Sequence, residues 1–149
     1  MHIPVLLKES VDSLNLKPNN IVVDATVNRA GHSLAIAKQI GKGGILVCID
    51  LDKDALNEAE KFLDKNLKAK DRPKIFFVND NFRNLEKILE DLKIKSIDAL
   101  VADLGVSSQE IDDSGRGFAF QRDEPLLMTL KIPIKKGDLT AEYIVKNWQ

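Results

Sequence analysis

Short apolar stretches alternate with longer amphipathic stretches along the first hundred residues of the chain. The apolar stretches are rich in β-branched or aromatic side chains and are bounded by polar residues or glycine, which is typical of buried strands in a parallel sheet. They are Ile21–Val23, Ile45–Ile49, Ile75–Val78 and Ile97–Ala102. The amphipathic stretches repeat apolar residues at helical spacing and predict helices. They cover residues 5–14, 33–40, 54–67 and 85–92.

Strands and helices in alternation, with connections of this length, predict right-handed βαβ units and a parallel sheet. The expected fold class is therefore α/β, a Rossmann-like doubly wound sheet in a single domain over residues 1–149. After Asp103 the alternation stops, and residues 104–139 carry glycines, prolines and scattered charges. This segment predicts a long loop region. Thr140, with Glu142 close behind, is suited to capping a final helix.

The amino-acid composition indicates the cellular compartment of the protein but says little about the reaction it carries out. The 149 residues are 44% hydrophobic and 30% charged, with a formal net charge of −1, which suits one globular domain with a core. No apolar run reaches the roughly 20 residues needed to cross a bilayer, and the N-terminus has no signal-peptide pattern. The single cysteine, Cys48, lies in an apolar run, so we expect a reduced cytoplasmic protein. Near-neutral charge argues against a general nucleic-acid clamp but is compatible with an RNA-modifying enzyme.

Polar side chains follow each of the predicted strands. Asp24, Asp50 and Asp103 come directly after three of them, and Asn79-Asp80-Asn81-Phe82 follows the other. Ligands of open α/β sheets bind outside the carboxyl ends of the strands. The sequence therefore predicts a ligand site at this edge of the sheet.

Asp50 is suited to accepting hydrogen bonds from both ribose hydroxyls of a nucleoside cofactor, because an acidic residue at the end of the second strand commonly does so. The alternative is that Asp50 caps the helix that begins near Lys53. We favour the ribose role because Asp52 is available as the cap.

The loop after the first strand argues against a dinucleotide. A pyrophosphate site would show G-x-G-x-x-G, whereas this loop has Gly31 alone. S-adenosylmethionine has no phosphate, so the loop favours it over NAD. His32 either faces a ligand or starts the helix. With two distant histidines and one cysteine, no metal site is expected.

The chain resembles the bacterial methyltransferase family that modifies the exocyclic N4 amine of a cytosine in small-subunit ribosomal RNA. The resemblance runs from the first residue to Trp148 and is most specific in the D-L-G-V-S-S block and the R-G-F-x-F downstream. The matching stretches are His2–Leu7, Val23–Thr26, Gly31–Ser33, Ile49–Asp52, Asn81-Phe82, Asp103–Ser108, Asp112–Phe120 and Glu124–Met128.

The resemblance implies the cofactor S-adenosylmethionine and a partner, the ribosomal RNA of the small subunit. It places cofactor contacts on Ala30, Gly31, His32, Asp50, Phe82, Asp103 and Glu110. It implies that Phe82 lies beside the adenine. Asp103 is then the best-placed acceptor to orient the cofactor or the attacking amine, and we assign it no role as a general base.

The chain departs from the family pattern in the first loop and after the fourth strand. Glu110 stands where the family has glutamine, so its side chain accepts hydrogen bonds but cannot donate them. Val27-Asn28-Arg29-Ala30 replaces a glycine-rich loop. Because asparagine tolerates left-handed backbone angles, we expect Asn28 to take a glycine position and Arg29 to point to solvent. The rival interpretation is a collapsed loop and a dead site. The family's D-M-R-M segment reads Leu127-Met128-Thr129-Leu130 here.

Members of the family continue beyond the position of Gln149 with a helical insertion and further strands. We therefore expect the sheet to have an exposed edge, through which copies of the chain could associate as a homo-oligomer. Basic residues after the fourth strand would meet RNA or form an ordinary solvated surface. They are Arg116, Arg122, Lys131, Lys135 and Lys136.

Three functional hypotheses follow. The first is a ribosomal RNA cytosine-N4 methyltransferase, of which this chain is the cofactor-binding front half. The second is a non-catalytic S-adenosylmethionine-binding module that needs a partner segment. The third, a small nucleotide-binding oxidoreductase, is disfavoured by the absent G-x-G-x-x-G.

Overall fold

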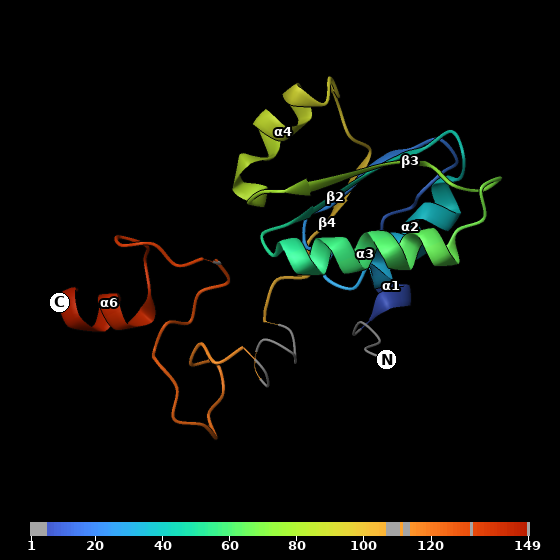
Figure 1. Ribbon diagram of the computed structural model, residues 1–149. Helices are drawn as coiled ribbons and strands as arrows, with labels where there is room; N and C mark the ends of the chain where they lie inside the picture. Colours follow the sequence, from blue (N-terminus) through green and yellow to red (C-terminus); the bar gives the residue numbers. More distant parts are fainter. Residues whose placement is uncertain (1–5, 107–110, 112–113, 132, 149) are drawn as a thin grey trace. The chain divides into compact units, whose positions relative to one another are not determined.

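The computed structural model describes residues 6–106, 111, 114–131 and 133–148 (Figure 1). The chain forms two compact units, residues 1–103 and residues 104–149. The first unit holds the predicted sheet and its helices, and the second begins where the strand–helix alternation ends.

The first unit contains every strand and helix that the hydrophobic pattern predicts there. In chain order they are α1 (Leu7–Ser13), β1 (Ile21–Asp24), α2 (Gly31–Ile40), β2 (Ile45–Asp50), α3 (Lys53–Asn66), β3 (Lys74–Asn79), the 3₁₀ helix η1 (Phe82–Asn84), α4 (Leu85–Asp91) and β4 (Ala99–Val101). Strand β4 is shorter than the predicted 97–102. At its start a carboxylate of Asp98 accepts from the backbone N–H of Ile21 at 2.7 Å, so a side chain takes a ladder position there.

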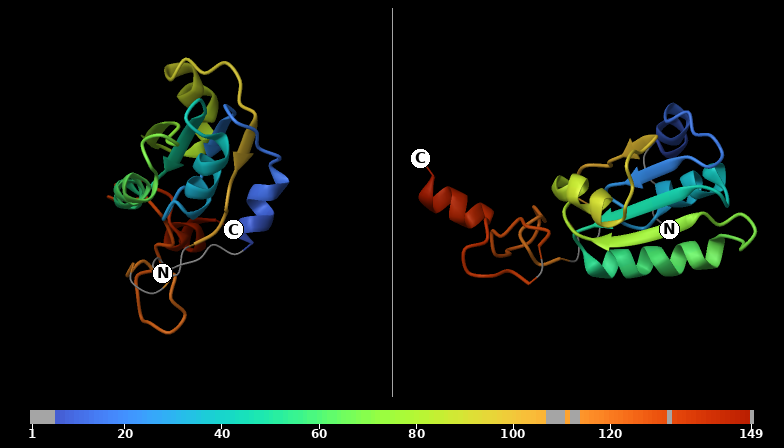
Figure 2. Two further views of the ribbon diagram at one scale, coloured as in Figure 1. Left: turned by 90° about the vertical axis from the view of Figure 1, so that its right-hand side faces the viewer. Right: turned by 90° about the horizontal axis from the view of Figure 1, so that it is seen from above.

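The four strands are parallel and lie in the order β3-β2-β1-β4. Figure 2 shows them side by side with their arrowheads at the same end of the sheet. The chain moves outward from β1 to β3 and then crosses back to place β4 on the other side of β1. This reversal between β1 and β4 is the switch point of a doubly wound sheet. The predicted fold class is confirmed.

Helices cover both faces of the sheet, with α4 on one face and α1, α2 and α3 on the other (Figure 1). Val22, Leu46 and Cys48 face the three-helix side, while Val23 and Val47 face α4. All five are fully buried. Burial on both faces explains why these strands are continuously apolar rather than alternating.

The second unit is ordered by side chains of its loop. Arg116 is buried, and its guanidinium donates to the carbonyl of Thr129 at 2.9 Å. A carboxylate of Glu124 accepts from the backbone N–H of Gly117 at 2.8 Å. A short helix, α6 (Ala141–Asn147), follows, and the hydroxyl of Thr140 caps it by accepting from the N–H of Tyr143 at 3.2 Å. The predicted cap is confirmed.

Candidate functional site

The carboxyl ends of the four strands bring acidic and amide side chains to one edge of the sheet. Asp24 ends β1, Asp50 ends β2 and Asn79 ends β3. Asp103 follows β4 by two residues. The switch point between β1 and β4 is where a doubly wound sheet opens a crevice for ligands. The site is therefore built around the exits of these two strands, with β2 and β3 beside them.

The loop between β1 and α2 is held by left-handed backbone angles and by the end of β2. Asn28 has φ +41° and Ala30 has φ +57°. The N–H of Val27 donates to the carbonyl of Ile49 at 3.1 Å. Arg29 is exposed. The prediction that Asn28 takes a left-handed position and that Arg29 points outward is confirmed, while the left-handed angle at Ala30 was not predicted.

Asp50 anchors this loop through its carboxylate. One oxygen accepts from the N–H of Asn28 at 2.9 Å and the other accepts from the N–H of Asp52 at 2.9 Å. Asp52 caps α3, because its carboxylate accepts from the N–H groups of Asp54 and Ala55. The capping alternative for Asp50 is therefore wrong, and Asp52 does the capping as expected.

Asn79 ties the ends of β2 and β3 together. Its side-chain amide donates to the carbonyl of Asp50 at 2.9 Å and to that of Leu51 at 3.0 Å. Sequence reasoning placed Asn79 at the sheet edge but gave it no role. It fixes the backbone that carries the Asp50 carboxylate.

Asp24 is a fully buried carboxylate at the base of the site. It accepts from the hydroxyl of Ser33 at 2.6 Å and from the N–H of Thr26 at 3.2 Å. Burial raises the pKa of Asp24 above its ordinary value, and these two hydrogen bonds oppose that rise. The carboxylate thereby connects the end of β1 to the first turn of α2.

The start of α2 presents three of the predicted contact residues, Ala30, Gly31 and His32. Ala30 is fully buried and precedes the helix, which begins at Gly31. His32 is buried, and among the described residues its Nε2 has no hydrogen-bond partner. A buried nitrogen without a partner is costly unless another group completes its bonding, so His32 is a candidate ligand contact.

The end of β3 presents an aromatic ring. Phe82, the first residue of η1, is 43% exposed. The segment before it is held by Asp80, whose carboxylate accepts from the N–H of Asn81 at 2.6 Å and the side chain of Asn84 at 2.8 Å. These bonds lower the pKa of Asp80. An exposed ring on a hydrogen-bonded turn offers a fixed apolar surface to a flat base.

Asp103 is exposed beyond the end of β4, and its backbone N–H donates to the hydroxyl oxygen of Thr26 at 2.7 Å. Thr26 was identified from the sequence only as part of the matching stretch Val23–Thr26 and was given no role. Its place two positions after Asp24 was a usable signal, because an Asp carboxylate commonly accepts from the N–H two residues on. Glu110, the remaining predicted contact, lies outside the described residues.

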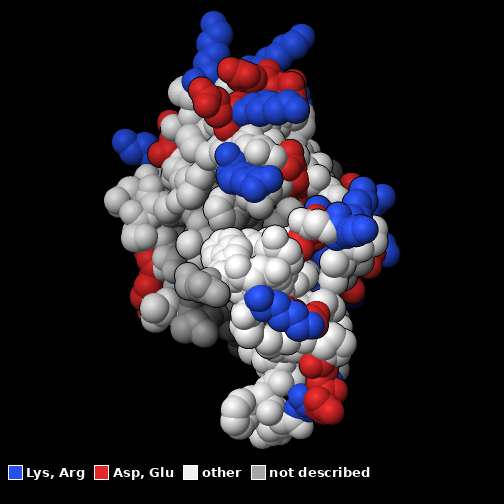
Figure 3. Space-filling model, turned by 90° about the vertical axis from the view of Figure 1, so that its left-hand side faces the viewer, with Lys and Arg blue, Asp and Glu red and all other residues white. Residues whose placement is uncertain are grey.

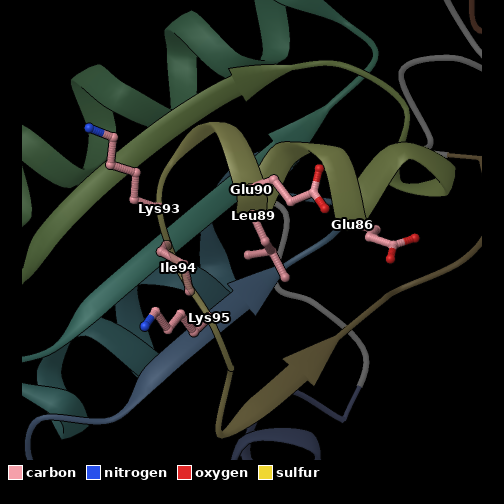
Figure 4. A pocket seen from close by; sticks show the side chains of 6 residues that line it. All are labelled: Glu86, Leu89, Glu90, Lys93, Ile94 and Lys95. Carbon is pink, nitrogen blue, oxygen red and sulfur yellow. The ribbon is translucent and has the colours of Figure 1, made fainter.

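A surface pocket lies elsewhere in the first unit, beside α4 and the turn after it (Figure 4). Its lining residues are Glu86, Leu89, Glu90, Lys93, Ile94 and Lys95. None of them is a predicted contact, and the last two precede β4, toward the amino ends of the strands. Among the described residues there is no metal-binding group of His, Cys, Asp or Glu, and no helix is long and apolar enough to cross a membrane.

The basic residues of the second unit are partly neutralised. Arg116 is buried, Arg122 lies 3.9 Å from a carboxylate of Glu124, and Lys131 forms an ion pair with Asp138. Figure 3, which draws both units, shows Lys and Arg side chains interspersed with Asp and Glu side chains on the face in view. This arrangement gives less positive charge for RNA than the five basic residues suggest.

Comparison with known proteins gives relatives that are named as ribosomal RNA methyltransferases. A protein of Halothermothrix orenii named ribosomal RNA small subunit methyltransferase H is 43% identical over 147 residues, which make up 99% of this chain and 44% of that protein. A protein of the same name from Clostridium botulinum is 38% identical over 148 residues, 99% of this chain and 45% of the relative. The chain thus spans less than half the length of the curated relatives it matches.

Among solved structures, an rRNA methylase from Streptococcus thermophilus matches 59% of this chain and 50% of its own, with a TM-score of 0.45 and 22% identity. The family model described as the MraW methylase family matches residues 1–149. The match extends over the sheet edge, the first loop and the whole second unit, and on this evidence the chain belongs to the MraW methylase family.

Proposed function

We propose that this chain binds S-adenosylmethionine at the carboxyl edge of its sheet. It would be the cofactor-binding part of a methyltransferase that acts on the N4 amine of a cytosine in small-subunit ribosomal RNA. The observation that carries the proposal is the convergence at the β1–β4 switch point. There the left-handed first loop, tied to Asp50, lies on the same sheet edge as Asp24 and Asp103. The relatives' names supply methyl transfer and the ribosomal RNA of the small subunit. The N4 amine of a cytosine is the position that the resemblance of the D-L-G-V-S-S block implies.

The groups at this edge fit the chemistry of the cofactor. A ribose needs hydrogen-bond acceptors, which the carboxylate of Asp50 provides. An adenine needs an apolar surface, which the exposed ring of Phe82 provides. The unpartnered Nε2 of His32 would bond a polar atom of the amino-acid part. No phosphate-binding glycine pattern is present, and the cofactor has no phosphate.

When bound, S-adenosylmethionine supplies an electrophilic methyl group on a positively charged sulfur. The cytosine amine would attack the methyl carbon in line, forming a nitrogen–carbon bond as the carbon–sulfur bond breaks. The electron pair of the broken bond would stay on sulfur, S-adenosylhomocysteine would leave, and the amine would lose its proton to water. The leaving group needs no acid, so the protein's contribution is positioning and desolvation. Asp103 would orient the cofactor or the amine through its carboxylate. The target base would have to leave its stack to reach this edge.

Calorimetry tests the binding step directly. The chain should bind S-adenosylmethionine and S-adenosylhomocysteine and should not bind NAD measurably. Asp50→Ala should weaken cofactor binding, whereas Glu60→Gln, which removes an exposed carboxylate of α3, should leave it unchanged. Preferential binding of NAD would contradict the proposal and favour the oxidoreductase.

A second candidate, a non-catalytic binding module completed by another polypeptide segment, is favoured by the edge of the sheet. Within the part of the chain that the structure describes, strand β4 pairs with β1 alone. Leu100 is 39% exposed, although its register partner Val23 is fully buried. Such an edge can pair with another chain, including a second copy. Sedimentation of the purified chain distinguishes a monomer from a self-associated form. A methyl-transfer assay on small subunits with the chain joined to the C-terminal part of a full-length relative distinguishes the two functions, because only the methyltransferase should then turn over.

A further inference from the structure

We propose that Thr26 is a positioning residue that fixes Asp103 for ligand contact through its side-chain hydroxyl. This inference rests on the proposed function, because it assigns Asp103 to the S-adenosylmethionine site. Thr26 belongs to the exit of β1 and Asp103 to the exit of β4, so the bond between them spans the switch point of the sheet.

The hydrogen bond between Thr26 and Asp103 lies just beyond the point where the ladder of β1 and β4 ends. The register of β1 and β4 ends at the pair Asp24 and Val101, and the N–H of Ala25 adds a bond to the carbonyl of Val101 at 2.9 Å. Beyond that point the two chains leave the ladder. The hydroxyl oxygen of Thr26 then accepts from the N–H of Asp103 at 2.7 Å. A side chain therefore continues the strand pairing up to the residue that carries the exposed carboxylate.

Thr26 is itself held in place by buried groups. Its N–H donates to one oxygen of Asp24, and the other oxygen accepts from the hydroxyl of Ser33 at 2.6 Å. Asp24 and Ser33 are fully buried. The β-branched side chain of threonine also has few rotamers. The series Ser33, Asp24, Thr26, Asp103 thus connects the first turn of α2, where Gly31 and His32 lie, to the end of β4.

The hydroxyl can be removed with almost no change of shape. Thr26→Val keeps the branched side chain and loses the acceptor, whereas Thr26→Ser keeps the acceptor. A hydrogen bond of this kind has a small net worth, so Thr26→Val should weaken S-adenosylmethionine binding by about three- to tenfold. Thr26→Ser should stay within about twofold of the unaltered chain. Thr140→Val is the matched control, because it removes another hydroxyl that accepts a backbone N–H, at the α6 cap.

A double-mutant cycle separates positioning from a general loss of stability. If Thr26 acts through Asp103, the penalty of Thr26→Val should nearly disappear in an Asp103→Ala background. A hydroxyl that only stabilises the sheet would weaken binding equally in both backgrounds. Amide hydrogen exchange of the ligand-free chain adds a readout independent of binding: the Asp103 N–H should exchange faster in Thr26→Val and not in Thr26→Ser.

The outcomes distinguish this inference from the proposed function. Binding that Asp103→Ala weakens and Thr26→Val leaves intact would overturn the inference alone. Additive penalties, or an equal loss in Thr140→Val, would also overturn it. If the unaltered chain binds no S-adenosylmethionine, the proposed function fails and the inference fails with it. Non-additive penalties with rescue by Thr26→Ser would establish Thr26 as the positioning residue.

Discussion

The carboxylate of Asp50 accepts a hydrogen bond from the backbone N–H of Asn28 at 2.9 Å, so the end of β2 holds the loop that follows β1. This relationship gives Asp50 two tasks in the candidate site. It would bind the ribose of the cofactor, and it keeps the first loop in its left-handed path.

Asp50→Ala should therefore weaken S-adenosylmethionine binding by about 1.5–3 kcal/mol, the range for hydrogen bonds to a charged group. Asp50→Asn retains one acceptor oxygen and should lose less. Calorimetry measures both affinities, and circular dichroism checks that the fold is intact. An unchanged affinity in a folded Asp50→Ala protein would contradict the ribose role.

Position 28 contributes to the loop through its backbone. Asn28→Gly keeps the N–H that bonds Asp50, and glycine adopts φ +41° without strain. Its affinity for S-adenosylmethionine should stay within a few-fold of the unaltered chain. Asn28→Val puts a β-branched side chain at a left-handed angle, which costs about 1–2 kcal/mol, and should weaken both binding and thermal stability. Equal effects of the two substitutions would contradict this explanation.

Gly31 begins α2 directly after the buried, left-handed Ala30. A ligand that approaches the backbone here tolerates almost no side chain. Gly31→Val should therefore abolish binding of S-adenosylmethionine in an equilibrium titration while the far-ultraviolet spectrum stays native. Retained affinity in this variant would show that the cofactor binds elsewhere.

The elements of the first unit could be predicted from the sequence because buried parallel strands and amphipathic helices have distinct hydrophobic periods. The bonds that shape the site could not. The contact of Thr26 with Asp103 depends on β4 lying beside β1, and that of Asn28 with Asp50 depends on β2 lying on the other side. Strand order is a property of the folded sheet. Ala30 has no local signal for a left-handed angle, so the packing around it must impose that conformation.

The thiol of Cys48 should be unreactive toward thiol reagents in the native protein. Burial raises the pKa of its thiol, and the thiolate is the reactive form. Ellman's reagent should detect almost no thiol in the folded chain and one thiol per chain after unfolding in guanidinium, since the sequence has a single cysteine. Rapid labelling under native conditions would show that β2 opens readily.

The purified chain should transfer little or no methyl group to small subunits by itself. Three of its five basic loop residues are buried or close to a carboxylate, and electrostatic attraction to RNA depends on unpaired positive charge. Incubation with tritiated S-adenosylmethionine and small subunits measures the transfer, with a full-length relative as the positive control. Turnover comparable to that of the relative would refute this prediction.

The raised pKa of the buried Asp24 carboxyl predicts how the stability of the chain depends on pH. Burial raises the pKa of its carboxyl above the ordinary value of 3.8, so the folded chain holds the proton more tightly than the unfolded chain does. Its contribution to stability is therefore greatest below that ordinary value. The contribution falls as pH rises through the folded-state pKa and is constant above it. The substitution Asp24→Asn removes the ionisation that imposes this loss.

The test compares the free energy of unfolding of the unaltered chain and Asp24→Asn between about pH 4 and pH 8. The difference should shift in favour of Asp24→Asn as pH rises and then level off. The other titrating groups contribute equally to the free energy of unfolding of both proteins, so their contributions cancel in the difference. Glu60→Gln is the control for removing an exposed carboxylate. The amide retains an oxygen for the Thr26 N–H, so the site should keep its shape. A difference that shifts the other way would show that the hydrogen bonds stabilise the buried carboxylate more than burial opposes it. A difference that is independent of pH would show that the two effects balance, and it would equally contradict the raised pKa.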